Sequence, residues 1–228
     1  MNSSFWGKQC FLWLASRRKV GVMNVLLVNG SPHKSGCVFS ALSEIAETLK
    51  KEGVESEIFH IGTRPVQGCA ACFACQKEGA EGCVFRDELY LEFVEQIKKC
   101  DAIVIGAPVY YAGPPGALCA ILDRVFFSAG RYLVHKPAAC VVNCRRGGAS
   151  AAFDRLNKYF TILQMPVVSS QYWNSTHGHN PKEIVQDVEG MQTMRTLARN
   201  MAYMLKSAER SGIPVPENED IVLTNFIR

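Results

Sequence analysis

Residues 24–30 read NVLLVNG, an unbroken apolar run that ends at a glycine. A run without alternation is typical of a strand buried on both faces, as in a parallel sheet covered by helices. The segment that follows, 37–51, has helical periodicity, with apolar residues at Val38, Leu42, Ile45 and Leu49. A buried strand followed directly by an amphipathic helix is the beginning of an α/β unit.

The same alternation continues along the chain. Further strands are predicted at 54–61, 101–109, 136–144 and 165–173, and further helices at 87–100, 114–127, 149–163 and 181–208. This order predicts an α/β three-layer sandwich, with helices on both faces of a five-stranded parallel sheet. Five strands favour the flavodoxin-like order 2-1-3-4-5. We expect an N-terminal extension at 1–22, one domain at 23–210 and a tail at 211–228.

The composition restricts the class of protein. The 228 residues are 48% hydrophobic and 20% charged, with a net charge of +4 and no basic run longer than Arg17–Lys19. This argues against nucleic acid as a partner. No apolar run reaches the length of a membrane span, and the N-terminal basic cluster follows its short apolar run, the reverse of a secretory signal. These features predict a cytoplasmic protein without a membrane partner.

Ligands of such sheets bind at the carboxyl ends of the strands. The loop 29–40, NGSPHKSGCVFS, leads into a helix start whose free N–H groups attract phosphate, and Ser31 and Ser35 add hydroxyl donors. It matches neither the dinucleotide fingerprint nor the P-loop. The loop 106–116, GAPVYYAGPPG, offers Tyr110 and Tyr111 to a planar ligand. The loop 143–150 offers Arg145 and Arg146 to an anion or to ring carbonyls.

Together these three segments resemble the FMN-binding segments of the flavodoxin-like NAD(P)H-dependent FMN reductases. The resemblance implies bound FMN, and it covers Met23 to about residue 170. The residues that it assigns to FMN are Ser31, His33, Ser35, Gly36, Cys37 and Val38 at the phosphate, and Pro108, Val109, Tyr110, Tyr111, Ala112, Gly113, Arg145 and Gly147 at the ring system. The family usually has Gly-Asn-Thr where this chain has Gly36-Cys37-Val38, so one phosphate-binding hydroxyl is missing.

The stretch 68–83, GCAACFACQKEGAEGC, contains four cysteines spaced C-x2-C-x2-C-x7-C, namely Cys69, Cys72, Cys75 and Cys83. Four thiolates suit a [4Fe–4S] cluster. Zinc, a disulfide or four idle thiols remain open as alternatives. The motif resembles that of the archaeal iron–sulfur flavoproteins, which implies a [4Fe–4S] cluster on these four residues. Because the stretch follows the second strand, we expect it at the carboxyl edge of the sheet, on the same face as the flavin.

We therefore predict an FMN-binding oxidoreductase that takes electrons from NAD(P)H and passes them to a small-molecule or protein acceptor. Since the flavin carries the chemistry, no catalytic acid or base is assigned. The first alternative is an iron–sulfur flavoprotein with FMN and a [4Fe–4S] cluster for transfer between proteins. The second is a non-enzymatic binding or regulatory module on the same fold. We expect a homodimer or homotetramer.

Overall fold

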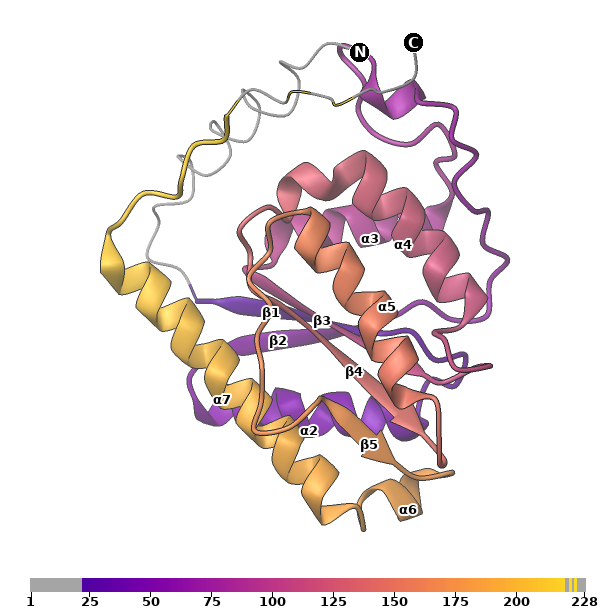
Figure 1. Cartoon of the computed structure of the whole chain (residues 1–228), viewed down its shortest axis with the longest axis vertical. Helices are drawn as coiled ribbons and strands as arrows, with labels where there is room; N and C mark the ends of the chain where they lie inside the picture. Colours follow the sequence, from indigo (N-terminus) through magenta and orange to yellow (C-terminus); the bar gives the residue numbers. More distant parts are fainter. Residues whose placement is uncertain (1–21, 220–221, 223, 225–228) are drawn as a thin grey trace.

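The computed structural model describes residues 22–219, 222 and 224. The predicted N-terminal extension, apart from Val22, and the end of the tail lie outside these residues. Five parallel strands form one sheet in the order β2-β1-β3-β4-β5, which confirms the predicted fold class (Figure 1). The strands are β1 (Asn24–Asn29), β2 (Glu55–His60), β3 (Ala102–Pro108), β4 (Ala138–Cys144) and β5 (Ser175–His177).

Helices cover both faces of this sheet. One face packs against α2 (Cys37–Lys51), α6 (Pro181–Ile184) and α7 (Val188–Ser211). The other packs against α3 (Glu88–Lys99), α4 (Gly116–Ala129) and α5 (Ala149–Ile162) (Figure 1). The inner strands alternate between the two cores: Leu26 and Val28 belong to one, and Val25 and Leu27 to the other. This is why their sequences are continuously apolar.

The described residues also contain two short 3-10 helices, η1 (Ala74–Gln76) and η2 (Gly130–Tyr132). No helix in the part of the chain that the structure describes is long and apolar enough to span a membrane. Because all five strands are parallel, the loops that follow β1, β3 and β4 leave from the same edge of the sheet.

The predictions for the last strand and the last helix were wrong in part. Residues 165–173 do not form a strand of the sheet. Val167 makes one isolated bridge with Ala138, and β5 begins only at Ser175. The predicted helix 181–208 is two helices, because the Asp187 side chain accepts a hydrogen bond from Gly190 N–H and starts a new helix there.

Candidate functional site

Two glycines let β1 and β3 come close where the first loop leaves the sheet. The Gly30 N–H donates to the Gly106 carbonyl over 2.8 Å. A Cβ on Gly30 would lie 2.8 Å from that oxygen and 2.5 Å from Leu118 Cδ2, and a Cβ on Gly106 would lie 2.7 Å from Val38 Cγ1. A larger residue at either position would therefore push the first loop and α2 away from β3.

The first loop is held from inside by its own polar groups. Ser31 N–H donates to Asn29 Oδ1 over 3.1 Å, and His33 N–H donates to Ser31 Oγ over 3.1 Å. Asn29 Nδ2 donates to the Lys34 carbonyl over 3.2 Å, and the His60 ring contacts the Ser31 carbonyl over 2.8 Å. Ser31 is thus buried and shapes the loop, whereas Ser35 and His33 are exposed at its surface.

The helix α2 begins without a side-chain cap and without an acidic residue in its first turn. Three other helices of the described chain have such a cap, from Asp87, Asn180 and Asp187. The first N–H groups of a helix have no partner within the helix, and its dipole attracts negative charge there. The residues at this end, Gly36 to Val38, therefore fit an anionic group such as a phosphate.

Cys37 and Val38 occupy the helix start where the family pattern has Asn and Thr. Its Sγ lies 3.6 Å from the Gly178 carbonyl, and burial is the main cause that raises the pKa of the thiol above its usual value. The side chain therefore stays neutral at physiological pH and does not repel an anion. Val38 is buried against β3 and can contribute only its backbone.

The second loop is a tight hairpin. Tyr110 and Gly113 exchange two backbone hydrogen bonds, of 2.8 and 2.9 Å, around Tyr111 and Ala112. These two residues have φ of 49° and 60°, a left-handed conformation that is rare for a bulky side chain and is found preferentially at functional sites. The turn leaves Tyr111 fully exposed and Tyr110 half-exposed, so both rings are accessible to a ligand.

The third loop contacts this hairpin. Gly148 has φ of 86°, and a Cβ on it would lie 2.9 Å from Ala112 Cα and 3.0 Å from Val109 Cγ1. Arg145 and Arg146 are exposed, and α5 begins after them without a side-chain cap. The structure thus brings together the two loops to which the sequence assigned the ring system, with Gly147 beside their contact.

Asn143 and Gly178 belong to the same edge and were missed from the sequence. Asn143 Nδ2 donates to the Gly178 carbonyl over 3.1 Å, and Thr176 donates to Asn143 Oδ1 over 3.1 Å. Val109 N–H donates to the Asn143 carbonyl over 3.0 Å. These bonds join the loop after β5 to the end of β4 and to the loop after β3. The signal was a polar residue, Asn143, at the end of the apolar run of β4.

All four cysteines of the stretch 68–83 line one pocket. The other described residues that line it are Ala70, Phe73, Val84, Phe85, Arg124, Phe127 and Ser128. Cys75 is buried, Cys83 is half-buried, and Cys69 and Cys72 are exposed. Burial is the main cause that raises the pKa of the Cys75 thiol, and the neighbouring Cys83 and Cys69 raise it further.

The backbone of this stretch curls tightly between the cysteines. Ala71 and Phe73, on either side of Cys72, have φ of 50° and 56°, and Gly79 and Gly82 have φ of 76° and 141°. Left-handed alanine and phenylalanine cost about 1–2 kcal/mol each. A loop that accepts this cost while directing its thiols into one pocket has the properties of a ligand-binding loop.

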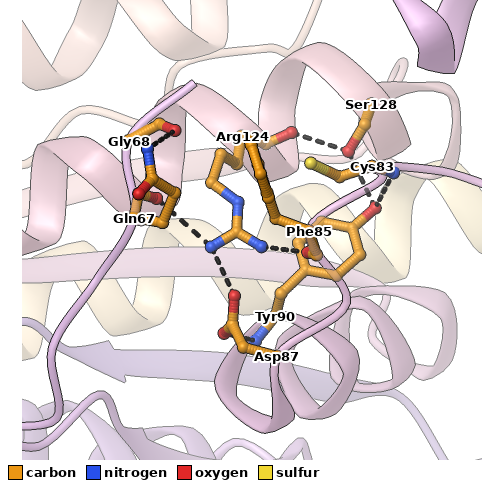
Figure 2. A network of polar contacts seen from close by, with 8 residues as sticks. All are labelled: Gln67, Gly68, Cys83, Phe85, Asp87, Tyr90, Arg124 and Ser128. Carbon is orange, nitrogen blue, oxygen red and sulfur yellow. Dashed lines mark hydrogen bonds and ion pairs between the residues drawn. The ribbon is translucent and has the colours of Figure 1, made fainter. Parts of the chain in front are cut away.

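Arg124 of α4 joins the two ends of the stretch (Figure 2). Its guanidinium donates to the carbonyls of Gln67 and Phe85 and pairs with Asp87 over 2.6 Å. Burial alone would lower the pKa of this arginine, but hydrogen bonds to the Cys83 and Asp87 side chains raise it overall. A single buried cation thus fixes the segments before Cys69 and after Cys83.

A second contact holds the fourth cysteine. Cys83 N–H donates to the Tyr90 hydroxyl over 2.9 Å, and this hydroxyl bonds Ser128 Oγ over 2.8 Å (Figure 2). Ser128 Oγ in turn donates to the Arg124 carbonyl over 2.7 Å. The fourth cysteine is therefore positioned by α3 and α4 and not by the loop alone.

The expected position of the cysteines was only partly right. Their stretch leaves β2 at the carboxyl edge, but the pocket contacts Arg124, Phe127 and Ser128, in the C-terminal half of α4. The three loops to which the sequence assigned FMN lie at the opposite end of this helix, which begins at Gly116. From Gly116 to Phe127 the helix rises about 16 Å. The two candidate sites are therefore separated along α4.

The cysteine pocket offers four sulfur donors from one stretch of chain. Among the described residues, no group of three or more histidine, cysteine or acidic side chains is arranged to hold one metal ion. In a [4Fe–4S] cluster each cysteine binds a different iron, so the four sulfurs surround a larger body than one ion. Zinc would require the four sulfurs to move together around one centre. The donor set itself, four free thiols on one pocket, matches the cluster.

Comparison with known proteins identifies the family of the chain. The model of the NADPH-dependent FMN reductase family matches residues 23–180. An iron–sulfur flavoprotein of Archaeoglobus fulgidus is 34% identical over 177 residues, which are 76% of this chain and 86% of that protein. Another from Methanocaldococcus jannaschii is 28% identical over 192 residues, 81% of this chain and 98% of that protein.

The fold has solved counterparts. The flavoenzyme NAD(P)H:(acceptor) oxidoreductase of Paracoccus denitrificans superposes with a TM-score of 0.62, at 18% identity over 82% of this chain and 98% of its own. This likeness supports the fold alone, whereas the family match covers all three flavin loops and the cysteine stretch. The chain belongs to the NADPH-dependent FMN reductase family and is an FMN-containing oxidoreductase.

Proposed function

We propose that this chain is an FMN-dependent oxidoreductase that also carries a [4Fe–4S] cluster on Cys69, Cys72, Cys75 and Cys83. The observation that carries this proposal is that all four cysteines line one pocket. Two iron–sulfur flavoproteins that align with more than three quarters of the chain support it. The alternatives of zinc and of a disulfide gain no comparable support.

The FMN site is proposed at the carboxyl edge of the sheet. The backbone of Gly36, Cys37 and Val38 would hold the phosphate through the uncapped start of α2, with Ser35 and His33 at the surface and Ser31 shaping the loop. The ring system would lie against the hairpin from Pro108 to Gly113, with Arg145 and Gly147 at its far edge. Bound FMN supplies hydride and single-electron chemistry. The described residues orient it and limit its contact with water.

The cysteine pocket would supply a second redox centre near the surface. Phe73, Val84, Phe85 and Phe127 line it and are each more than a third exposed. An apolar rim around a redox centre keeps water from the thiolates and gives an acceptor protein a surface to contact. We therefore propose that electrons enter from a nicotinamide nucleotide at the flavin and leave at the cysteine pocket.

Two further expectations belong to this proposal. The described cysteines are all free thiols, which suits a reducing compartment such as the cytoplasm. Tyr172 and Trp173 are exposed aromatic residues whose rings lie 5.2 Å apart. Such a pair is typical of an interface, which supports a homodimer or homotetramer. Light scattering of the full chain that gives the mass of a monomer would contradict this expectation.

The experiment that tests the cluster compares two cysteine variants. Cys83→Ala removes a ligand from the pocket, whereas Cys119→Ala removes a half-buried thiol of α4 that does not line it. Both are purified without oxygen, and iron and FMN are measured per chain. We expect Cys83→Ala to lose most of its iron and keep its FMN, and Cys119→Ala to keep both. Equal iron in the two variants would contradict the proposed ligand set.

A second candidate function is an NAD(P)H-dependent FMN reductase in which the four cysteines bind no cluster. The exposure of Cys69 and Cys72, unusual for structural thiols, is the observation that favours it. The same variants distinguish the two. If wild-type protein contains FMN that NADPH bleaches, and contains no iron after anaerobic reconstitution, this second function holds.

A further inference from the structure

The cysteine pocket has one charged side chain, and it is completely buried. Arg124 is the only charged residue among the described residues that line the pocket, and its side chain is 0% exposed. A buried arginine stays charged because its guanidinium loses its proton only at very high pH. Its field is also screened much less by water and salt than that of a surface charge. The pocket therefore contains a fixed positive charge.

The contacts of the guanidinium leave one of its three nitrogens without a partner among the described residues. The two terminal nitrogens donate to Gln67, Phe85 and Asp87. Nε is buried and has no hydrogen-bond partner in the described part of the chain. A buried donor without a partner is costly unless something absent from the structure accepts from it. Cys83 lines the same pocket as Arg124.

The counter-ion of Arg124, Asp87, does not line the pocket and is more exposed than the arginine. The Asp87 side chain is 43% exposed, against 0% for Arg124. Water therefore weakens the field of the carboxylate more than the field of the guanidinium. Although the Arg124–Asp87 pair is formally neutral, the electrostatic field in the pocket comes mainly from the Arg124 guanidinium.

We infer that Arg124 is a positioning residue that sets the reduction potential of the cluster by placing a buried positive charge, with an unpartnered Nε–H, in the lining of the pocket that also contains Cys83. This inference rests on the proposed cluster ligands. Reduction adds one electron and no proton, so it increases the negative charge in the pocket. A nearby buried cation and a hydrogen bond to a ligand sulfur both stabilise the reduced form, and so raise the potential.

The test measures the potential of the cluster and not the activity. Full-length protein is reconstituted without oxygen and titrated spectroelectrochemically, with the potential of its own FMN as an internal reference. Arg124→Gln removes the charge at similar size, and we expect reduction to become at least tenfold less favourable, which is about 59 mV for one electron. Arg124→Lys keeps the charge, and we expect a change of less than about threefold.

Two other variants separate charge from position. Asp87→Asn keeps an N-cap residue for α3 but removes the counter-ion, so we expect the cluster potential to rise, opposite in sign to Arg124→Gln. Tyr90→Phe removes the acceptor of the Cys83 N–H without a change in charge, so we expect less iron but nearly the same potential in the clusters that form. A role in folding alone would not give shifts of opposite sign.

Each outcome decides the inference. If Arg124→Gln does not fold, a potential that stays constant or falls in Asp87→Asn overturns it. If wild type and variants all hold the cluster at one potential, the inference fails and the proposed function stands. If wild type holds no iron after reconstitution, the proposed function fails, and the inference fails with it.

Discussion

Gly82 is the residue at which a single methyl group should disturb the cysteine pocket most. It has φ of 141°, and a Cβ on it would lie 2.5 Å from the Tyr90 hydroxyl oxygen. This hydroxyl accepts the Cys83 N–H and bonds Ser128. Gly82→Ala therefore strains the backbone and displaces the group that holds the fourth cysteine.

The size of the effect follows from these two causes. A residue forced into a region that only glycine populates costs about 1–3 kcal/mol. Two displaced hydrogen bonds cost about 0.5–1.5 kcal/mol each. Gly82→Ala should thus destabilise the protein by roughly 2–6 kcal/mol, a decrease in Tm on the order of 10 °C for a chain of this size.

Gly79 provides a matched control in the same stretch. It also has a positive φ, of 76°, but no atom lies within 4 Å of a Cβ built on it. Gly79→Ala should cost about 1 kcal/mol, from backbone strain partly offset by reduced freedom of the unfolded chain. The difference between the two variants therefore isolates the contact with Tyr90.

The assay combines thermal unfolding of the metal-free proteins with iron and FMN content after anaerobic reconstitution. We expect Gly82→Ala to retain FMN, because the flavin loops lie at the other end of α4, and to lose most of its iron. Gly79→Ala should keep both. If the two variants have the same Tm and the same iron content, then Tyr90 does not position Cys83 and the reasoning is refuted.

Two further predictions concern other parts of the chain. Gly148→Ala places a Cβ 2.9 Å from Ala112 Cα at φ of 86°. The strain of about 1–3 kcal/mol should raise the Kd for FMN roughly tenfold or more, while the iron content stays constant. A fluorescence titration that shows unchanged affinity would contradict the proposed ring site. Burial lowers the pKa of His135, so folding should be most favourable above the unfolded pKa of about 6.5 and lose stability as the pH falls through the folded value. Denaturant unfolding at pH 7 and pH 5 should show a smaller loss in His135→Asn, which keeps a residue tolerant of the left-handed φ at this position; an equal loss would exclude this histidine as the cause.

The inner strands could be predicted because their physical cause is local. The run from Val25 to Val28 is buried on both faces, as its unbroken apolar sequence predicts. The last strand is different. β5 pairs with β4 only at Ser175–His177. The apolar pair Val167–Val168 led to the prediction of a strand at 165–173, but the chain leaves the sheet between this pair and Ser175. An edge strand needs few paired residues, so its apolar pattern locates it poorly.

The common edge of the loops that follow β1, β3 and β4 could be predicted from the strand ends, but the position of the cysteine pocket could not. A strand end fixes only where a loop starts, and the stretch between β2 and α3 is long enough to reach the far half of α4. Arg124 was missed for the same reason: within its helix it occupies a buried position that an apolar residue usually fills, and its partners are distant in sequence. An arginine in an otherwise apolar helical face was the available signal.

The most direct test of the central claim is the iron and FMN content of the full-length wild-type protein, purified without oxygen, together with its absorbance spectrum. The account predicts about four irons and one FMN per chain. It also predicts a broad cluster absorbance at about 400 nm, beneath the flavin bands, and this cluster absorbance disappears on reduction. Flavin bands with no iron, in protein that also fails to take up iron and sulfide during reconstitution, would contradict it.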